Sequence, residues 1–283
     1  MSGCLRPLLL LDNGSLEPAA TLSLRRIAAE LGRALGREVL PLSLLHSHKV
    51  PAEALGGVAA EILEPALKRR LAAGQNGFDV VPLFFGPSGA LTEYLPARLE
   101  VLRKTWPELD LRVAPCLAEP AGSEEGGEGV EGDGVLLDIL EEHVAGRLDG
   151  TGAQRVILVD HGSPRAEVTE VRDRLARQLA QRLGGRVAGV AAASMERRPE
   201  PEYDFNEPLL ERALRALPEG PCEVVLAMLF VSPGRHAGPG GDIVQICEAA
   251  CAERPGLHVR MTPLVGEHPG LVRLLARRAE SLA

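Results

Sequence analysis

The stretch "VILVDHGSPR" (residues 156–165) runs from four apolar residues into Asp-X-Gly-Ser, and "LLLLDNGSLE" (residues 8–17) does the same. A short apolar run that ends in a turn signal is typical of a buried β-strand. In the later copy X is His161, whereas in the earlier copy X is Asn13. The chain therefore contains one strand-and-turn unit twice and keeps the imidazole only once.

An amphipathic helix is predicted after each of these turns. Apolar residues recur there at steps of three and four, which is the period of one helix face. They are Leu24, Ile27, Leu31 and Leu35 in the first copy, and Val168, Val171, Leu175, Leu179 and Leu183 in the second. Gly36 and Gly184 come next and are expected to end the two helices, because glycine readily adopts the left-handed conformation of a helix C-cap.

The rest of each copy repeats the same order of elements. The paired segments are second strands (38–45 and 186–194), helices (63–71 and 206–214), third strands (79–85 and 223–230), Gly/Pro loops (86–96 and 231–243), fourth strands (109–119 and 257–267) and final helices (135–148 and 271–283). Strands that alternate with helices predict parallel sheets covered on both faces. We therefore expect an α/β fold of two tandem duplicated domains, residues 1–150 and 151–283, each a mainly parallel four-stranded sheet flanked by helices.

Composition limits the classes of function. A net charge of −8 argues against a general nucleic-acid binder. Much of that charge lies in an acidic, Gly-rich insertion at about residues 119–134, which we expect to be a mobile loop. No run approaches the roughly 18 apolar residues of a membrane span. The N-terminus lacks the features of a signal peptide, so we expect a cytoplasmic protein.

Ligands of open parallel sheets bind at the carboxyl ends of the strands. In the second copy these ends carry His161, Glu196 and His236, one from each of the first three strands. Two imidazoles and a carboxylate suit a divalent first-row metal, and imidazoles also accept protons near neutral pH. Glu202 and Asp204 are alternatives to Glu196, because the connection that contains them is long.

The first copy has lost this chemistry. Asn13 stands opposite His161, and an alignment without gaps places Ala90 opposite His236. A rough alignment places His46 or His48 opposite Glu196, and whether this His-X-His pair binds metal stays open. We therefore predict a degenerate N-terminal half.

Three motifs at these separations, "LVDHGSPR" (158–165), "EPLLERAL" (207–214) and "LFVSPGRH" (229–236), resemble the CbiX-type sirohydrochlorin chelatases, a branch of the class II chelatases. The similarity covers residues 154–283 closely and the first half more faintly. It implies insertion of cobalt, iron or nickel into sirohydrochlorin or a related tetrapyrrole, in cobalamin or siroheme biosynthesis. It also implies that His161 and His236 bind the metal or take the pyrrole protons, assisted by an acidic residue such as Glu196. The divalent metal ion is then a substrate, and no organic cofactor is expected.

The tetrapyrrole implied by this resemblance is anionic, so the site needs local positive charge. Arg235, Arg197 and Arg198 flank the candidate acid–base residues and are placed to bind its carboxylates. Gly234 would let the backbone approach a large ring closely. Ser163 is a further candidate for substrate binding, although its place after the strand is also that of a helix N-cap. One departure from the family pattern is the segment "AGPGG" (237–241), which separates His236 from Asp242 and Ile243.

Two other functions remain open. The same histidine pair could serve a non-catalytic carrier of metal or tetrapyrrole, and the trio could hold a metal with an open water position in a metal-dependent hydrolase. We expect no nucleic-acid or membrane partner. The duplication is compatible with a monomer or a homodimer.

Overall fold

The computed structural model describes residues 6–118 and 128–282, the side chains of 128–132 excepted. Each repeat forms one four-stranded, all-parallel sheet. The first sheet has the order β2-β1-β3-β4 and contains β1 (Leu8–Asp12), β2 (Val39–Ser43), β3 (Gly77–Pro82) and β4 (Asp110–Val113). The second has the order β6-β5-β7-β8 and contains β5 (Arg155–Asp160), β6 (Gly189–Ser194), β7 (Cys222–Met228) and β8 (Leu257–Met261). The predicted fold class is confirmed.

Helices connect the strands in both sheets. They are α1 (Pro18–Leu35), α2 (Leu63–Ala72), α3 (Leu95–Arg103), α4 (Glu128–Ala145), α5 (Ala166–Leu183), α6 (Leu210–Arg215), α7 (Asp242–Glu253) and α8 (Pro269–Glu280). As predicted, Gly36 and Gly184 follow the last residues of α1 and α5, with φ angles of 63° and 49°. No helix in the described parts of the chain is long and apolar enough to cross a membrane.

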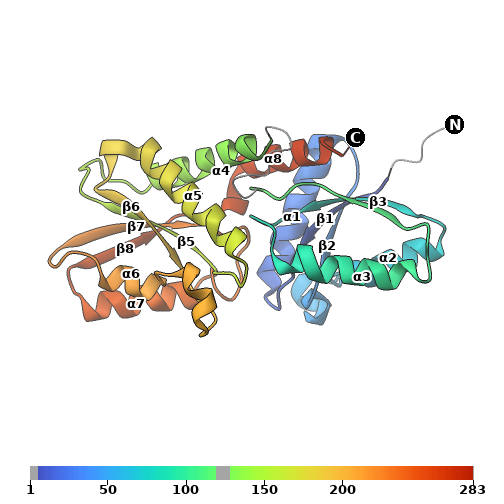
Figure 1. Cartoon of the computed structure of the whole chain (residues 1–283), viewed down its shortest axis with the longest axis horizontal. Coiled ribbons are helices and arrows are strands. Elements are labelled where there is room, and N and C mark those ends of the chain that lie inside the picture. The colour runs from blue at the N-terminus through green and yellow to red at the C-terminus, as the bar shows by residue number, and fades with distance from the viewer. Residues whose placement is uncertain (1–5, 119–127, 283) are drawn as a thin grey trace. The chain divides into compact units, whose positions relative to one another are not determined.

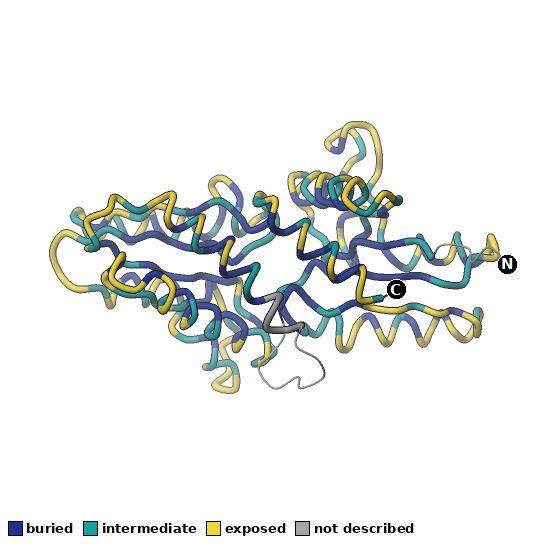
Figure 2. The backbone as a smooth tube through the Cα atoms, turned by 90° about the horizontal axis from the view of Figure 1, so that it is seen from above, coloured by how far each residue is buried: buried dark blue, intermediate teal, exposed yellow. Residues whose placement is uncertain are grey.

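The central strands β1, β3, β5 and β7 form the core of each sheet, as their near-continuous apolar runs predict, whereas the edge strand β4 is largely exposed. All four leucines of Leu8–Leu11 are at most 1% exposed. Figure 2 shows long buried segments, in dark blue, with exposed segments around them. In the second unit α4 and α5 cover one face of the sheet while α6 and α7 cover the other (Figure 1). Because helices cover both faces, the loops at the strand ends are left as the places where polar side chains can meet a ligand.

The two compact units of the chain do not coincide with the two sequence repeats. One unit comprises Met1–Leu117 with Val272–Ala283, and the other comprises Ala118–Leu271. The final helix of each repeat therefore packs in the unit of the other repeat: α4 contacts α5 and β7, whereas Arg278 of α8 donates to the carbonyl oxygen of Leu117. Each unit needs chain from both repeats to complete it.

Two segments differ from their predicted structure. The helix expected over 206–214 begins only at Leu210, because the buried Asn206 side chain bonds to the turn around Ser163 and to Tyr203. The insertion expected as a loop over 119–134 ends in helix, since α4 begins at Glu128, and residues 119–127 lie outside the described residues. Asp133 of that segment is buried and binds Arg174 with two N–O distances of 2.5 and 3.1 Å.

Candidate active site

The turn after β5 is fixed against the loop after β6. Gly162 has a φ of 92°, and a Cβ there would lie 1.9 Å from the carbonyl oxygen of Glu196. The Glu196 amide donates to the carbonyl oxygen of His161 at 3.1 Å. Only glycine allows this approach, so the Asp-His-Gly-Ser motif serves to bring the two strand-end loops into contact.

His161, Glu196 and His236 lie together at the carboxyl ends of β5, β6 and β7. The His161 Nε2 atom is 3.4 Å from Glu196 Oε1. The imidazole rings of His161 and His236 have their centroids 4.6 Å apart and meet edge to face at 67°. Of the three carboxylates considered from sequence, Glu196 is the one that reaches His161. Asp204 instead pairs with Arg197 at 2.9 Å, and Glu202 is exposed.

The hydrogen bonds of His161 define which nitrogen faces the carboxylate. Its Nδ1 lies 3.0 Å from the carbonyl oxygen of Gly162, which can only accept, so Nδ1 donates. Nε2 is then the atom directed at Glu196. A nitrogen lone pair and a carboxylate oxygen repel each other unless a cation lies between them. This pair is therefore suited to share a proton or a divalent metal ion.

Among the side chains that the structure describes, no group of three or more His, Cys, Asp or Glu residues has the geometry to hold a metal ion. The trio is thus two imidazoles and a carboxylate side by side, with His161 and Glu196 about half exposed, and not a closed cage of ligands. A closed cage is the mark of a resident structural metal.

Asp242, to which the sequence analysis assigned no role, contacts His236 directly. Its Oδ2 lies 2.7 Å from His236 Nδ1. The sequence separates the two residues by the segment 237–241, and only the folded loop brings them together.

A buried polar cluster supports the turn from beneath. Asp160 accepts from the Gly162 amide at 3.1 Å and from Ser194 Oγ at 2.6 Å. Arg172 of α5, which is 1% exposed, donates to Ser194 Oγ at 2.5 Å and lies 3.8 Å from Asp160. Burial raises the pKa of Asp160, while Arg172 and the Ser194 hydroxyl act against that rise. The sequence carried one signal of this cluster: Arg172 stands on the apolar face of its helix, where a charge needs a partner.

The predicted arginines differ in how far their own loops occupy them. Arg197 is largely buried and bonds to Glu207 at 2.8 Å as well as to Asp204. Arg198 lies over the Tyr203 ring at 5.2 Å and donates to its hydroxyl. Arg235 is 77% exposed, with its Nε 3.7 Å from Asp242. Of the three, Arg235 has the guanidinium best able to turn toward a ligand.

Ser163 and Gly234 both take part in turns. The buried Ser163 accepts at Oγ from the Arg165 amide at 3.0 Å, and its own amide donates to Asn206 Oδ1. The carbonyl oxygen of Gly234 accepts from the Gly238 amide at 2.8 Å. The Ser163 hydroxyl thus bonds within the turn, and the N-cap of α5 is Arg165, so Ser163 is not the helix N-cap that its sequence position offered. Its role toward substrate stays a prediction.

The first repeat has the same frame with different side chains. Leu45 donates from its amide to the carbonyl oxygen of Asn13 at 3.1 Å, as Glu196 does to His161. Leu45 is therefore the counterpart of Glu196, and the alignment of His46 or His48 with that residue was wrong by one or more positions. Leu11 pairs with Pro82 in the first sheet, and its counterpart Val159 pairs with Met228 in the second sheet. Pro82 and Met228 are therefore equivalent, and counting on from them without gaps places Ala90 opposite His236.

Comparison with known proteins supports the reading of the second repeat. The CbiX family model matches residues 155–282, which confirms the resemblance for that part of the chain. No curated protein matches the sequence.

Solved structures match over the length of the chain. SirB from Bacillus subtilis with Fe3+ has a TM-score of 0.67 at 14% identity, over 98% of this chain and 95% of SirB. The sirohydrochlorin chelatase SirB from Bacillus subtilis subspecies spizizenii in complex with cobalt has the same TM-score, identity and coverage. CbiX, the terminal enzyme for biosynthesis of siroheme in denitrifying bacteria, has a TM-score of 0.60 at 18% identity, over 98% of this chain and 100% of CbiX. At such identities these matches establish that both repeats share the chelatase fold.

Proposed function

We propose, from the premise that residues 155–282 are a CbiX-family region, that this protein inserts a divalent metal ion into sirohydrochlorin or a related tetrapyrrole. The observation that carries the proposal is the facing pair of His161 Nε2 and Glu196 Oε1, 3.4 Å apart, with the His236 ring beside it. Cobalt or iron is the expected metal, with nickel as a further option, because SirB structures hold Fe3+ or cobalt. The metal decides whether the product serves cobalamin or siroheme synthesis.

The reaction exchanges one divalent ion for two protons. Two inner N–H groups of the macrocycle lose their protons, the hydrated metal loses water, and four ring nitrogens take the metal. Neutral imidazoles and a carboxylate suit both halves of this exchange, since each offers a lone pair to a proton or to a metal ion. We assign the metal or the pyrrole protons to His161 and His236, and we assign assistance to Glu196.

Substrate binding is assigned to the arginines at the same strand ends. The exposed Arg235 binds a carboxylate of the anionic macrocycle, and Arg198 and Arg197 contribute positive potential from the next loop. Gly234 gives the ring close access to the backbone, and Ser163 shapes the turn on which His161 stands. The expected cytoplasmic location, the absence of nucleic-acid and membrane partners, the absence of an organic cofactor, and a monomeric or dimeric state stay predictions.

The test is to mix the full chain with sirohydrochlorin and Co2+ or Fe2+ without oxygen and to follow the absorption spectrum. We expect conversion to the metallated spectrum well above the rate without protein. The matched control is His258→Ala, which removes an exposed imidazole of β8 and should convert at the wild-type rate. A spectral shift of bound tetrapyrrole without metallation would indicate a carrier and overturn the proposal. Ester or amide hydrolysis in place of metallation would indicate a metal-dependent hydrolase.

A further inference from the structure

The contact between His236 and Asp242 fixes the protonation pattern of the ring. A carboxylate only accepts hydrogen bonds, so the 2.7 Å contact places the proton of the neutral imidazole on Nδ1. Nε2 then carries the lone pair. The same arrangement, a carboxylate bound to the far nitrogen of a histidine, orients metal-binding histidines and raises their basicity.

The Gly-rich segment 237–241 makes this contact possible. Its backbone folds back on itself, with the Gly238 amide bonded to Gly234 and the Gly241 amide bonded to Gly238. A Cβ at Gly238 would lie 2.6 Å from the carbonyl oxygen of Gly234, and a Cβ at Gly241 would lie 2.8 Å from that of His236. A loop of this tightness excludes larger residues at both positions. The extra residues thus form a closed loop, and they do not carry Asp242 away from the histidine.

The helix after the loop holds Asp242 in place. Asp242 is the first residue of α7, and its neighbour Ile243 is fully buried in the core between the sheet and α7. The amides of Asp242 and Ile243 donate to the carbonyl oxygens of Arg235 and His236 at 3.3 and 3.2 Å. Because both ends of the contact are tied to one helix terminus, the carboxylate is preorganised against the imidazole.

The first repeat lacks both members of the pair. Ala90 stands opposite His236 by strand register. The same register, continued without gaps, places Pro96 opposite Asp242. Where the imidazole is absent, the carboxylate is absent too, which is expected if the carboxylate serves the imidazole.

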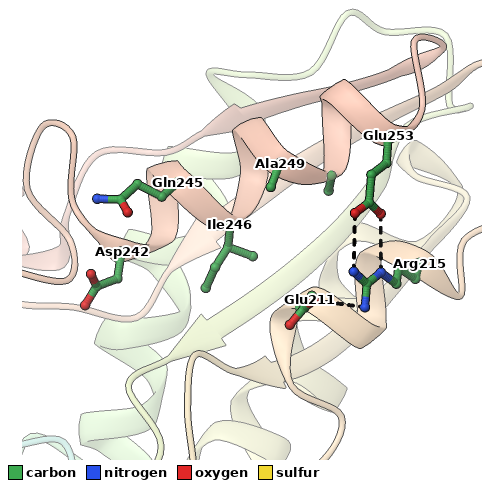
Figure 3. A pocket seen from close by; sticks show the side chains of 8 residues that line it. Glu211, Arg215, Asp242, Gln245, Ile246, Ala249 and Glu253 are labelled. Atoms are coloured by element: carbon green, nitrogen blue, oxygen red, sulfur yellow. Dashed lines mark hydrogen bonds and ion pairs between the residues drawn. The ribbon is translucent and has the colours of Figure 1, made fainter.

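We propose that Asp242 is a positioning residue of the metal-insertion reaction, which holds His236 in the tautomer that presents an unprotonated Nε2 to the metal or to a pyrrole proton. This inference rests on the proposed function. We assign this role to Asp242 alone and not to the summed negative charge of the groove that it lines. The other two carboxylates of that groove, Glu211 and Glu253, bind Arg215 at 2.8 and 3.4 Å. Figure 3 shows Asp242 at one end of this groove of about 360 Å³ between α6 and α7, with that ion cluster at the other end.

The experiment compares Asp242→Asn with Glu211→Gln in the full chain. An amide can donate to Nδ1, so we expect the His236 proton to move to Nε2 in Asp242→Asn, as ¹⁵N chemical shifts of the ring report without metal or substrate. We also expect Co2+ affinity and turnover to fall about 10- to 100-fold, the usual effect of losing a residue that orients a metal ligand. Glu211→Gln should leave the ring shifts, the Co2+ affinity and the turnover at wild-type values.

Asp242→Glu serves as the conservative variant and should restore the Nδ1-protonated signal in part, with turnover between those of wild type and Asp242→Asn. Unchanged ring shifts in Asp242→Asn, or an equal loss in Glu211→Gln, would overturn the proposal. If Asp242→Asn does not fold, the ring shifts and turnover of Asp242→Glu are compared with those of Glu211→Gln, and equal values in the two variants would overturn the proposal. A wild-type chain that fails to metallate sirohydrochlorin would refute the proposed function alone, because the ring shifts and the Co2+ affinity are measured without that reaction.

Discussion

The turns after β1 and β5 share a backbone and differ in their side chains. Gly14 and Gly162 have φ angles of 88° and 92°, and a Cβ on either would overlap the next strand-end loop, 1.7 Å from the carbonyl oxygen of Leu45 or 1.9 Å from that of Glu196. The first turn keeps this close approach although Asn13 and Leu45 stand where the second turn has His161 and Glu196. The Asp-X-Gly-Ser frame is therefore a structural device, and the chemistry depends on which side chains it holds.

A second difference lies beneath the two turns. Asp160 is buried beside Arg172, whereas the α1 residue opposite Arg172 is Leu24. Among the described side chains, Asp12 Oδ1 and Thr21 Oγ1 are buried atoms with no hydrogen-bond partner. Without a neighbouring arginine, burial raises the pKa of Asp12 to about 6. The repeat with the candidate chemistry thus has a buried carboxylate beside an arginine, whereas only hydrogen bonds from Ser43 and from the backbone act against the burial of Asp12.

The largest expected effect comes from giving the second turn the side chain of the first. His161→Asn should lower the rate of metal insertion by roughly 1,000-fold, since an amide is not basic and a positioned acid–base group contributes roughly 10²- to 10⁴-fold. The rate is measured from the absorption of sirohydrochlorin with Co2+. Thermal melting should be unchanged, because His161 is half exposed on a loop.

The matched control for this change is Asn13→Ala in the first turn. We expect it to retain wild-type turnover, because that rim offers no imidazole at position 13 or 90. A loss as complete as that of His161→Asn would show that the first repeat takes part in the chemistry, and the comparison would then fail.

Arg172→Leu gives the buried cluster beneath the β5 turn the residue type that the first repeat has at the matching position, Leu24. Removing one partner of a buried pair leaves an unpaired charge, so we expect a loss of about 3–5 kcal/mol in the free energy of unfolding. Urea unfolding at pH 7 measures it, and Arg172→Leu with Asp160→Asn should recover part of the loss. The control is Arg182→Leu, which breaks an exposed pair with Asp138 and should cost less than about 1 kcal/mol. Equal losses in both variants would mean that the buried cluster stabilises nothing.

Asp12→Asn tests the buried carboxylate of the first repeat, which has no arginine beside it. The pKa of about 6 in the folded protein exceeds the ordinary value of 3.8, so the native state binds more protons than the unfolded state between these pH values. Stability is then complete below about pH 4 and declines as pH rises to about 6. Asp12→Asn should remove this decline and stabilise the protein at pH 7.5 by roughly 1–3 kcal/mol. Glu219→Gln, a change at an exposed carboxylate, should keep the wild-type pH profile, and a profile unchanged in Asp12→Asn would contradict the assignment.

The fold was predictable because its signals are local and occur twice. Apolar runs, helix periodicity and a glycine after the first helix (Gly36 or Gly184) mark the same elements in both repeats, so each repeat checks the other. The placement of α4 and α8 was not predictable, since both are apolar on one face and either could cover either sheet. Which sheet a helix covers depends on long-range packing that no periodicity in its own sequence encodes.

The candidate site was predictable only as far as strand ends imply proximity. His161, Glu196 and His236 each follow a different parallel strand, and the structure brings them together. Asp242 was missed because its contact depends on the closure of the segment 237–241. Leu45 was misaligned because the loop that follows β2 turns at His46, which has a φ of 63° that its sequence does not announce.

The smallest expected effect concerns the choice of carboxylate at the end of β6. The first repeat has Leu45, without a carboxylate, in the place of Glu196. Glu196→Gln tests whether the carboxylate adds to the binding of metal or protons by the two imidazoles. Gln keeps the size and one oxygen but cannot accept a proton, and it is a poorer metal ligand, so we expect turnover to fall about 10-fold, less than for a histidine.

Asp204→Asn and Glu202→Gln are the matched controls from the same loop, and both should stay within about twofold of wild type, as expected for exposed carboxylates away from the reacting atoms. Asp204→Asn has the larger structural consequence of the two, since it removes the ion pair with Arg197, yet Arg197 keeps its bond to Glu207. If Asp204→Asn or Glu202→Gln proves more damaging than Glu196→Gln, the acid that serves the two histidines is not the one that lies 3.4 Å from His161.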